Sequence, residues 1–142
     1  MNRRKSTTMI IVHCSATREG QDIKAKTIKQ WHLQRGFADI GYHYIIDLDG
    51  TIEKGREESL VGAHCIGKNA ISIGICYVGG CDKNLKPKDT RTDAQKKAMK
   101  TLVHHLMEKY NIPLNNVYGH YQFCSTKFCP CVKIDKLRED LK

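Results

Sequence analysis

The chain has 142 residues, which fits one domain that can bury a core without disulfide bonds. Hydrophobic residues make up 40% of the chain and charged residues 27%, which is typical of a globular protein and not of a disordered or membrane-spanning one. The net charge of +9 favours an anionic partner, but it does not choose between nucleic acid and an acidic cell envelope.

The first two predicted elements are a strand and a helix. Met9–Cys14 is rich in β-branched residues and predicts a buried strand. Lys24–Arg35 has a helical pattern that places Ile28 and Trp31 on one apolar face, and Gly36 follows as the expected end of the helix.

A hairpin and a further strand are predicted next. Tyr42–Glu53 contains two strand-like runs separated by Asp49-Gly50, which favours a two-residue type I′ turn. Ala70–Val78 reads as another strand that ends before Gly79-Gly80.

The last third of the chain predicts a long helix, a short strand and a final helix. Thr92–Gln95 has the pattern of a capping box and opens a helix to about Tyr110, which Pro113 should end. An apolar stripe runs along this helix through Ala98, Leu102 and Leu106. Asn116–Gly119 then predicts a strand and Ile134–Leu141 a helix.

This alternation of strands and helices predicts one α/β domain with a central mixed β-sheet flanked by helices. Residues 1–8 are expected to form a basic N-terminal arm, and residues 9–142 the domain itself. The basic start is followed by an apolar run of only Met9–Val12, too short for a secretory signal, so we expect a cytoplasmic protein.

Histidine and cysteine residues collect where predicted elements end. His13 lies near the end of the first strand, His120 follows the last strand, and Cys129 lies in the loop beyond it. Ligands of open α/β sheets gather at the carboxyl ends of strands, so these three side chains could hold a catalytic zinc ion in a surface cleft. A structural zinc site formed by His120 with Cys124, Cys129 and Cys131 is an alternative, and so is a site with no metal.

Several short motifs follow one another along the chain: His13-Cys-Ser-Ala-Thr17, Trp31-His32, Gly41-Tyr-His-Tyr-Ile-Ile46, Asp49-Gly50-Thr51, Gly55-Arg56, Val61-Gly-Ala-His64, Asn69, Ser72-Ile-Gly-Ile75, Val78-Gly-Gly80, His120 and Lys127-Phe-Cys-Pro130. In this order they resemble the type-2 N-acetylmuramoyl-L-alanine amidases. That family includes small phage lysozyme-amidases and is similar in fold to the peptidoglycan recognition proteins. The resemblance spans about Met9 to Lys136, and the order of the motifs carries it more than any single motif does.

The resemblance implies a set of zinc ligands, namely His13, His120 and Cys129. One departure bears on the third ligand, because His120 and Cys129 are one residue further apart than in the phage members of the family. Cys124 and Cys131 are therefore competing candidates. Cys129 is preferred because Pro130 follows it directly and a lysine precedes it by two positions.

The resemblance also implies roles for four further residues. Tyr42 and Lys127 match the catalytic pair of the family. His43 and His64 match histidines near the cleft, and we expect them to bind substrate.

The function that follows is zinc-dependent hydrolysis of the amide bond between N-acetylmuramic acid and L-alanine in peptidoglycan. A monomer is expected that stays in the cytoplasm until it is released to the cell wall, without a membrane partner and without nucleic acid as its main ligand. Two rivals remain open: a non-catalytic peptidoglycan-binding module, and a regulatory binder of a protein such as a polymerase, for which Arg3-Arg4-Lys5 is the candidate contact. A Cys–His nucleophile pair has no local signature in the chain.

Overall fold

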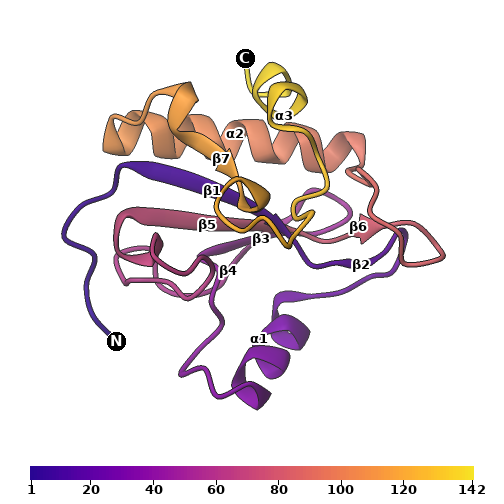
Figure 1. Ribbon diagram of the computed structural model, residues 1–142, viewed down its shortest axis with the longest axis horizontal. Helices are drawn as coiled ribbons and strands as arrows, with labels where there is room; N and C mark the ends of the chain where they lie inside the picture. The colour runs from indigo at the N-terminus through magenta and orange to yellow at the C-terminus, as the bar shows by residue number, and fades with distance from the viewer.

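A five-stranded mixed sheet forms the centre of the computed structural model, which describes residues 1–142 (Figure 1). Its strands lie in the order β4-β3-β5-β1-β7, and all neighbours are parallel except the β3–β4 hairpin. The bounds are β1 Met9–Cys14, β3 Tyr44–Ile46, β4 Ile52–Lys54, β5 Ser72–Tyr77 and β7 Val117–Gly119. A separate parallel pair joins β2, Thr17–Arg18, to β6, Gly80–Cys81.

Helices cover both faces of this sheet (Figure 1). The long helix α2, Asp93–Tyr110, and the short α3, Ile134–Asp140, lie on one face, and α1, Ala25–Gln34, lies on the other. Three single 3-10 turns complete the regular structure, at Asn69–Ile71, Leu114–Asn116 and His120–Gln122. The predicted single α/β domain with a mixed sheet is confirmed. None of these helices is both long enough and apolar enough to cross a membrane.

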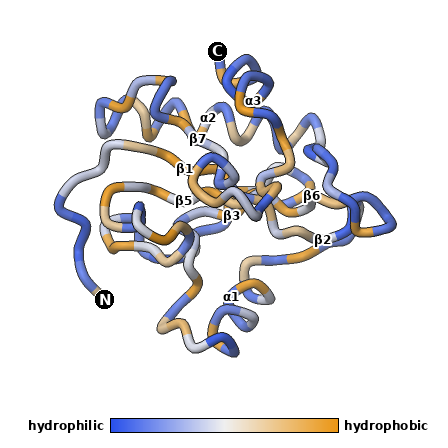
Figure 2. Tube along the Cα trace, in the orientation of Figure 1, coloured by the Kyte–Doolittle hydropathy of each residue, from blue (hydrophilic) through white to orange (hydrophobic).

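The main core lies between the sheet and the helices α2 and α3. Successive side chains of a strand point to opposite faces, so Ile10, Val12 and Cys14 of β1 enter this core. His13, at the intervening position, points to the face that carries α1. The hydrophobic residues of β1 and β5 lie at the centre of the molecule, whereas the N-terminal segment is largely hydrophilic (Figure 2).

The register of the sheet brings the ends of two distant strands together. β1 and β7 are parallel neighbours, with Val12 paired to Gly119. The residues that follow, His13 and His120, therefore lie side by side, and their ring centroids are 4.5 Å apart.

The hairpin forms as predicted, but its turn differs from the expected type I′. A type I′ turn needs positive φ at both central residues, and only Gly50 has it, at 87°. The amide of Asp47 donates to the carbonyl of Thr51, which leaves a three-residue loop with glycine in the left-handed position. A side chain at position 50 would lie 2.8 Å from the carbonyl oxygen of Ala94, so the turn packs closely on the start of α2.

The buried face of α1 also differs from the prediction, whereas both ends of α2 agree with it. The buried face of α1 carries Ile28 and His32, whereas Trp31 is 39% exposed and lines the cleft described below. The helix α2 ends at Tyr110 as predicted, and Asn111 caps it in the left-handed conformation at φ 56°. The capping box at its start is present as predicted.

The N-terminal residues run alongside the segment that leads to His64. Arg3 forms an antiparallel bridge with Leu60, and the amide of Val61 donates to the carbonyl of Asn2. The guanidinium of Arg4 donates to the carbonyl of Leu60 at 3.0 Å.

Candidate functional site

His13, His120 and Cys129 converge at the carboxyl ends of β1 and β7. Their potential ligand atoms all lie within 4.8 Å of one another. His13 is 1% exposed, whereas His120 and Cys129 are half-buried, so the group is open on one side. The parallel register of β1 and β7 supplies the two histidines, and the loop after His120 supplies the cysteine.

The loop that carries Cys129 is held to the strand ends by several hydrogen bonds. The amide of Tyr121 donates to the carbonyl of Cys129 at 2.8 Å, and the Tyr77 hydroxyl donates to the carbonyl of Pro130 at 2.6 Å. The amide of Cys14 donates to the Cys129 Sγ at 3.1 Å. This last contact fixes the position of the Cys129 sulfur beside the end of β1.

The three donors suit a zinc ion. Two imidazoles and one thiolate are a recognised donor set of catalytic zinc sites, which leave the fourth position open. Zinc bonds of about 2.0–2.3 Å in a tetrahedral arrangement place neighbouring donors about 3.3–3.6 Å apart. The donor atoms of His13, His120 and Cys129, all within 4.8 Å of one another, are close enough together to fit one ion.

Neither competing cysteine belongs to this group of donors. Cys124 lines the cleft and contacts the Thr126 hydroxyl at 3.4 Å. Cys131 packs against the main core, where its sulfur lies 3.9 Å from that of Cys14. All seven cysteines are free thiols.

Two of the donors, His120 and Cys129, line a cleft with a volume of about 880 Å³. One wall comes from α1 and the segment after it, with Trp31, Arg35 and Phe37, and another comes from the loop around Ile66. The charged side chains that line it, Arg35 and Lys127, are both cations. The cleft is therefore suited to a partly apolar ligand that carries or develops negative charge.

Tyr42 and Lys127 both line this cleft. The ring of Tyr42 lies 5.0 Å from that of His13, between centroids. Burial, together with nearby thiols, raises the pKa of Tyr42 well above its usual value, so its hydroxyl keeps its proton at neutral pH. Lys127 is exposed. Burial of the His120 ring lowers the pKa of His120, and the positive charge of Lys127 lowers it further.

His64 contacts His13 directly. Its Nδ1 lies 2.8 Å from the Nε2 of His13, and its Nε2 lies 3.2 Å from the Ser72 hydroxyl. The ring is 8% exposed, and burial, followed by the charges of His43 and His120, lowers its pKa to about 3. His64 is therefore a neutral imidazole at pH 7.

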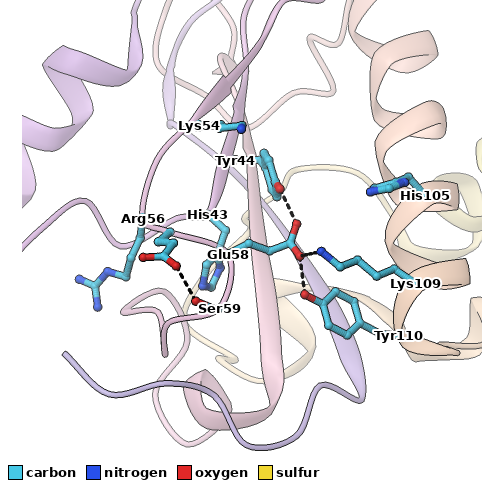
Figure 3. A pocket seen from close by; sticks show the side chains of 10 residues that line it. His43, Tyr44, Lys54, Arg56, Glu58, Ser59, His105, Lys109 and Tyr110 are labelled. Atoms are coloured by element: carbon cyan, nitrogen blue, oxygen red, sulfur yellow. Dashed lines mark hydrogen bonds and ion pairs between the residues drawn. The ribbon is translucent and has the colours of Figure 1, made fainter.

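His43 lies behind His64, away from the cleft. Its Nδ1 accepts from the amide of Gly74 at 3.0 Å, and its Nε2 lies 2.8 Å from the carbonyl oxygen of Leu60. Both ring nitrogens are therefore occupied by backbone groups. The ring borders a second pocket of about 580 Å³, in which Glu58 is the centre of a hydrogen-bonded cluster (Figure 3).

Two residues that the sequence analysis assigned no role belong to the site. Arg35 follows α1 and lies over the ring of Phe37, with 5.1 Å from its guanidinium carbon to the ring centroid. Ser72 is buried at the start of β5 and contacts His64. Ser72 stands in a motif that carried the resemblance, so its position could have drawn attention, but nothing in the sequence pairs it with His64.

The chain is similar to known proteins over most of its length. A family model described as N-acetylmuramoyl-L-alanine amidase matches residues 3–132. The chain is 46% identical over 128 residues to the endolysin of Escherichia phage T7, covering 90% of this chain and 83% of that protein. It is 37% identical over 134 residues to the endolysin of Enterobacteria phage K11, covering 94% and 87%.

A solved structure shares the fold. N-acetylmuramoyl-L-alanine amidase LysC from Clostridium intestinale URNW matches with a TM-score of 0.82 at 28% identity, covering 99% of this chain and 93% of that one. The family model and these relatives agree across nearly the whole chain, so this protein belongs to the N-acetylmuramoyl-L-alanine amidase family.

Proposed function

We propose that this protein is a zinc-dependent enzyme that hydrolyses the amide bond between N-acetylmuramic acid and L-alanine in bacterial peptidoglycan. The observation that carries the proposal is the convergence of His13, His120 and Cys129 in a cleft whose charged side chains are cations. Membership of the amidase family supports the choice of bond.

The three donors would hold the ion, with the open side of the group facing the cleft. When bound, zinc supplies a Lewis acid that polarises a carbonyl group and makes a water molecule acidic near neutral pH. The Cys14 amide would hold the Cys129 Sγ in place through its contact at 3.1 Å. Burial, followed by neighbouring histidines, lowers the pKa of His13, which leaves its imidazole neutral and able to offer a lone pair.

Tyr42 would act through the proton of its hydroxyl. Because its pKa is raised, the phenol donates a hydrogen bond and does not act as a base at neutral pH. Its place beside His13 would let it orient the attacking water or pass a proton to the leaving nitrogen.

Lys127 would supply positive charge next to the oxyanion that develops on the scissile carbonyl. Loss of one such group typically costs about 10²–10³ in rate. The flexible lysine is exposed, so we expect it to take up its working position when substrate fills the cleft.

The lining of the cleft favours amide hydrolysis over cleavage of the glycan. Glycosidases usually act through two carboxyl groups that flank an oxocarbenium-like sugar. Here the cationic side chains of Arg35 and Lys127 line the cleft instead, which suits a reaction that creates one oxyanion.

The substrate belongs to the bacterial wall, so we propose that the enzyme acts after its release to that wall, as a monomer. Regulation by a protein such as a polymerase stays a prediction, and the exposed Arg3 and Lys5 are the residues to alter in a binding test.

Turnover of purified peptidoglycan with and without a chelator tests the proposal. The chelator should abolish activity, and added zinc should restore it. Cys129→Ala should lose both the ion and the activity, whereas the matched variant Cys124→Ala should keep both. The opposite result for the two variants would move the third ligand to Cys124, and full activity in the chelator would remove the metal from the mechanism.

A further inference from the structure

Hydrogen bonds to the backbone of His64 and close packing around its ring hold this residue in place. The Asn69 side-chain oxygen accepts from the amides of His64 and Cys65, at 2.8 and 2.9 Å. Two glycines make room for the ring, because a Cβ at Gly74 would lie 2.6 Å from His64 Cγ and one at Gly62 would lie 2.8 Å from His64 Cδ2. The ring therefore lies directly against the backbone of β5.

A chain of hydrogen bonds runs from His13 through His64 and Ser72 to the carbonyl of Lys68. The Ser72 hydroxyl donates to that carbonyl oxygen at 2.7 Å. A carbonyl oxygen can only accept, and a serine hydroxyl has one proton, so Ser72 can only accept from His64.

The Ser72 hydroxyl, which donates to the Lys68 carbonyl, fixes the direction of the other hydrogen bonds in the chain. The Nε2 of His64, 3.2 Å from the Ser72 oxygen, must carry the proton of the neutral ring. The Nδ1 of His64 then has a free lone pair, and the Nε2 of His13, 2.8 Å away, must donate to it. The Nδ1 of His13 is left unprotonated, which is the form that a metal ion requires.

We propose that His64 is a positioning residue that holds His13 in the tautomer that presents Nδ1 to the metal, with the direction of the hydrogen bonds set by Ser72 and the Lys68 carbonyl. The inference rests on the proposed use of His13 as a ligand. It adds a contact with the metal-binding His13 to the expected contact of His64 with substrate. Outer partners of this kind typically contribute about 10–100-fold to metal affinity.

Variants of His64 separate this role from mere packing. The Oδ1 of asparagine stands where the Nδ1 of histidine stood, so His64→Asn can still accept from His13. Leucine fills similar space and accepts nothing. We expect His64→Leu to weaken zinc binding about 10–100-fold and His64→Asn to stay much closer to the wild type. Ser72→Ala should give a smaller loss, because it frees the direction of the bonds without removing the acceptor.

Zinc affinity of the full-length protein is measured by competition with a chromophoric chelator, with His105→Leu as a control that removes an exposed imidazole outside the cleft. Equal zinc affinity in His64→Leu and the wild type would overturn the inference. A loss in His64→Asn as large as that in His64→Leu would also overturn it, because packing would then explain the effect.

Long-range ¹H–¹⁵N spectra of the metal-free wild type test the tautomer without any variant or any zinc. The expected spectrum has protonated Nε2 and unprotonated Nδ1 on both His13 and His64. A proton on the Nδ1 of His13 would contradict the inference. A wild type that binds no zinc but shows the expected tautomers would instead contradict the proposed function alone.

Discussion

Replacing Gly74 by alanine should destabilise the protein through a collision with one side chain. The added Cβ would lie 2.6–2.8 Å from the Cγ, Cδ2 and Nδ1 atoms of His64, and ordinary contact begins at 3.4 Å. The ring would have to move by about 0.8 Å, the difference between 3.4 and 2.6 Å, away from its place beside His13. Overpacking of a well-packed interior typically costs about 1–3 kcal/mol.

Urea denaturation followed by circular dichroism measures this cost. The samples contain excess chelator, because an ion bound only to the folded state would add to the stability. In thermal denaturation the same cost corresponds to a midpoint about 3–9 °C lower for a domain of this size.

The double variant with His64→Ala isolates the cause. The three atoms nearest to that Cβ all belong to the His64 ring, so in the background without the ring Gly74→Ala should cost less than about 0.5 kcal/mol. An equal cost in both backgrounds would refute the reasoning, since the strand itself and not His64 would then resist the side chain.

Three further predictions concern other parts of the molecule. Tyr42→Phe and Lys127→Ala should bind zinc normally but lose about 10²–10³ in kcat, with little change in KM, in steady-state assays. Burial opposes ionisation of Glu58, but hydrogen bonds from Lys109, Tyr110 and Tyr44 together lower its pKa to about 2 (Figure 3). The stability that the Glu58 carboxylate contributes is therefore present above about pH 4.5 and is lost as the pH falls towards 2. Glu58→Gln should show no such loss when urea denaturation is compared at pH 6 and pH 3. Burial, followed by the neighbouring Glu53, raises the pKa of Asp47 to about 7. The stability of the wild type relative to Asp47→Asn should therefore fall as the pH rises from about 4 through 7. A difference in stability that stays constant over this range would contradict the raised pKa.

The fold could be predicted well where the chain carries strong local signals. The β-branched run Met9–Cys14 and the capping box of α2 lie where the sequence placed them. The type I′ turn was wrong, because Asp49-Gly50 is compatible with more than one loop length and contacts with α2 decide which one forms. The exposed position of Trp31 was also missed, since helical spacing shows which residues share a face but not what lies opposite.

In the candidate site, too, some features could be predicted from the sequence and others depend on tertiary contacts. His13 and His120 could be expected to meet, because both come at the ends of strands and parallel strands share an edge. Cys129 could be proposed from its place in the loop after His120, and the resemblance then favoured it over the competing Cys124 and Cys131. The contact between His64 and Ser72 could not be predicted, because it depends on how a loop folds back onto β5.

The bond that is cut tests the account most directly. Purified peptidoglycan digested with the full-length protein is analysed by mass spectrometry, with the Cys129→Ala variant as the control digest. The account predicts lactyl-bearing glycan, intact stem peptides with a new amino group on L-alanine, and no new reducing sugar ends. Fragments cut inside the stem, with L-alanine still joined to the sugar, would contradict the amidase assignment.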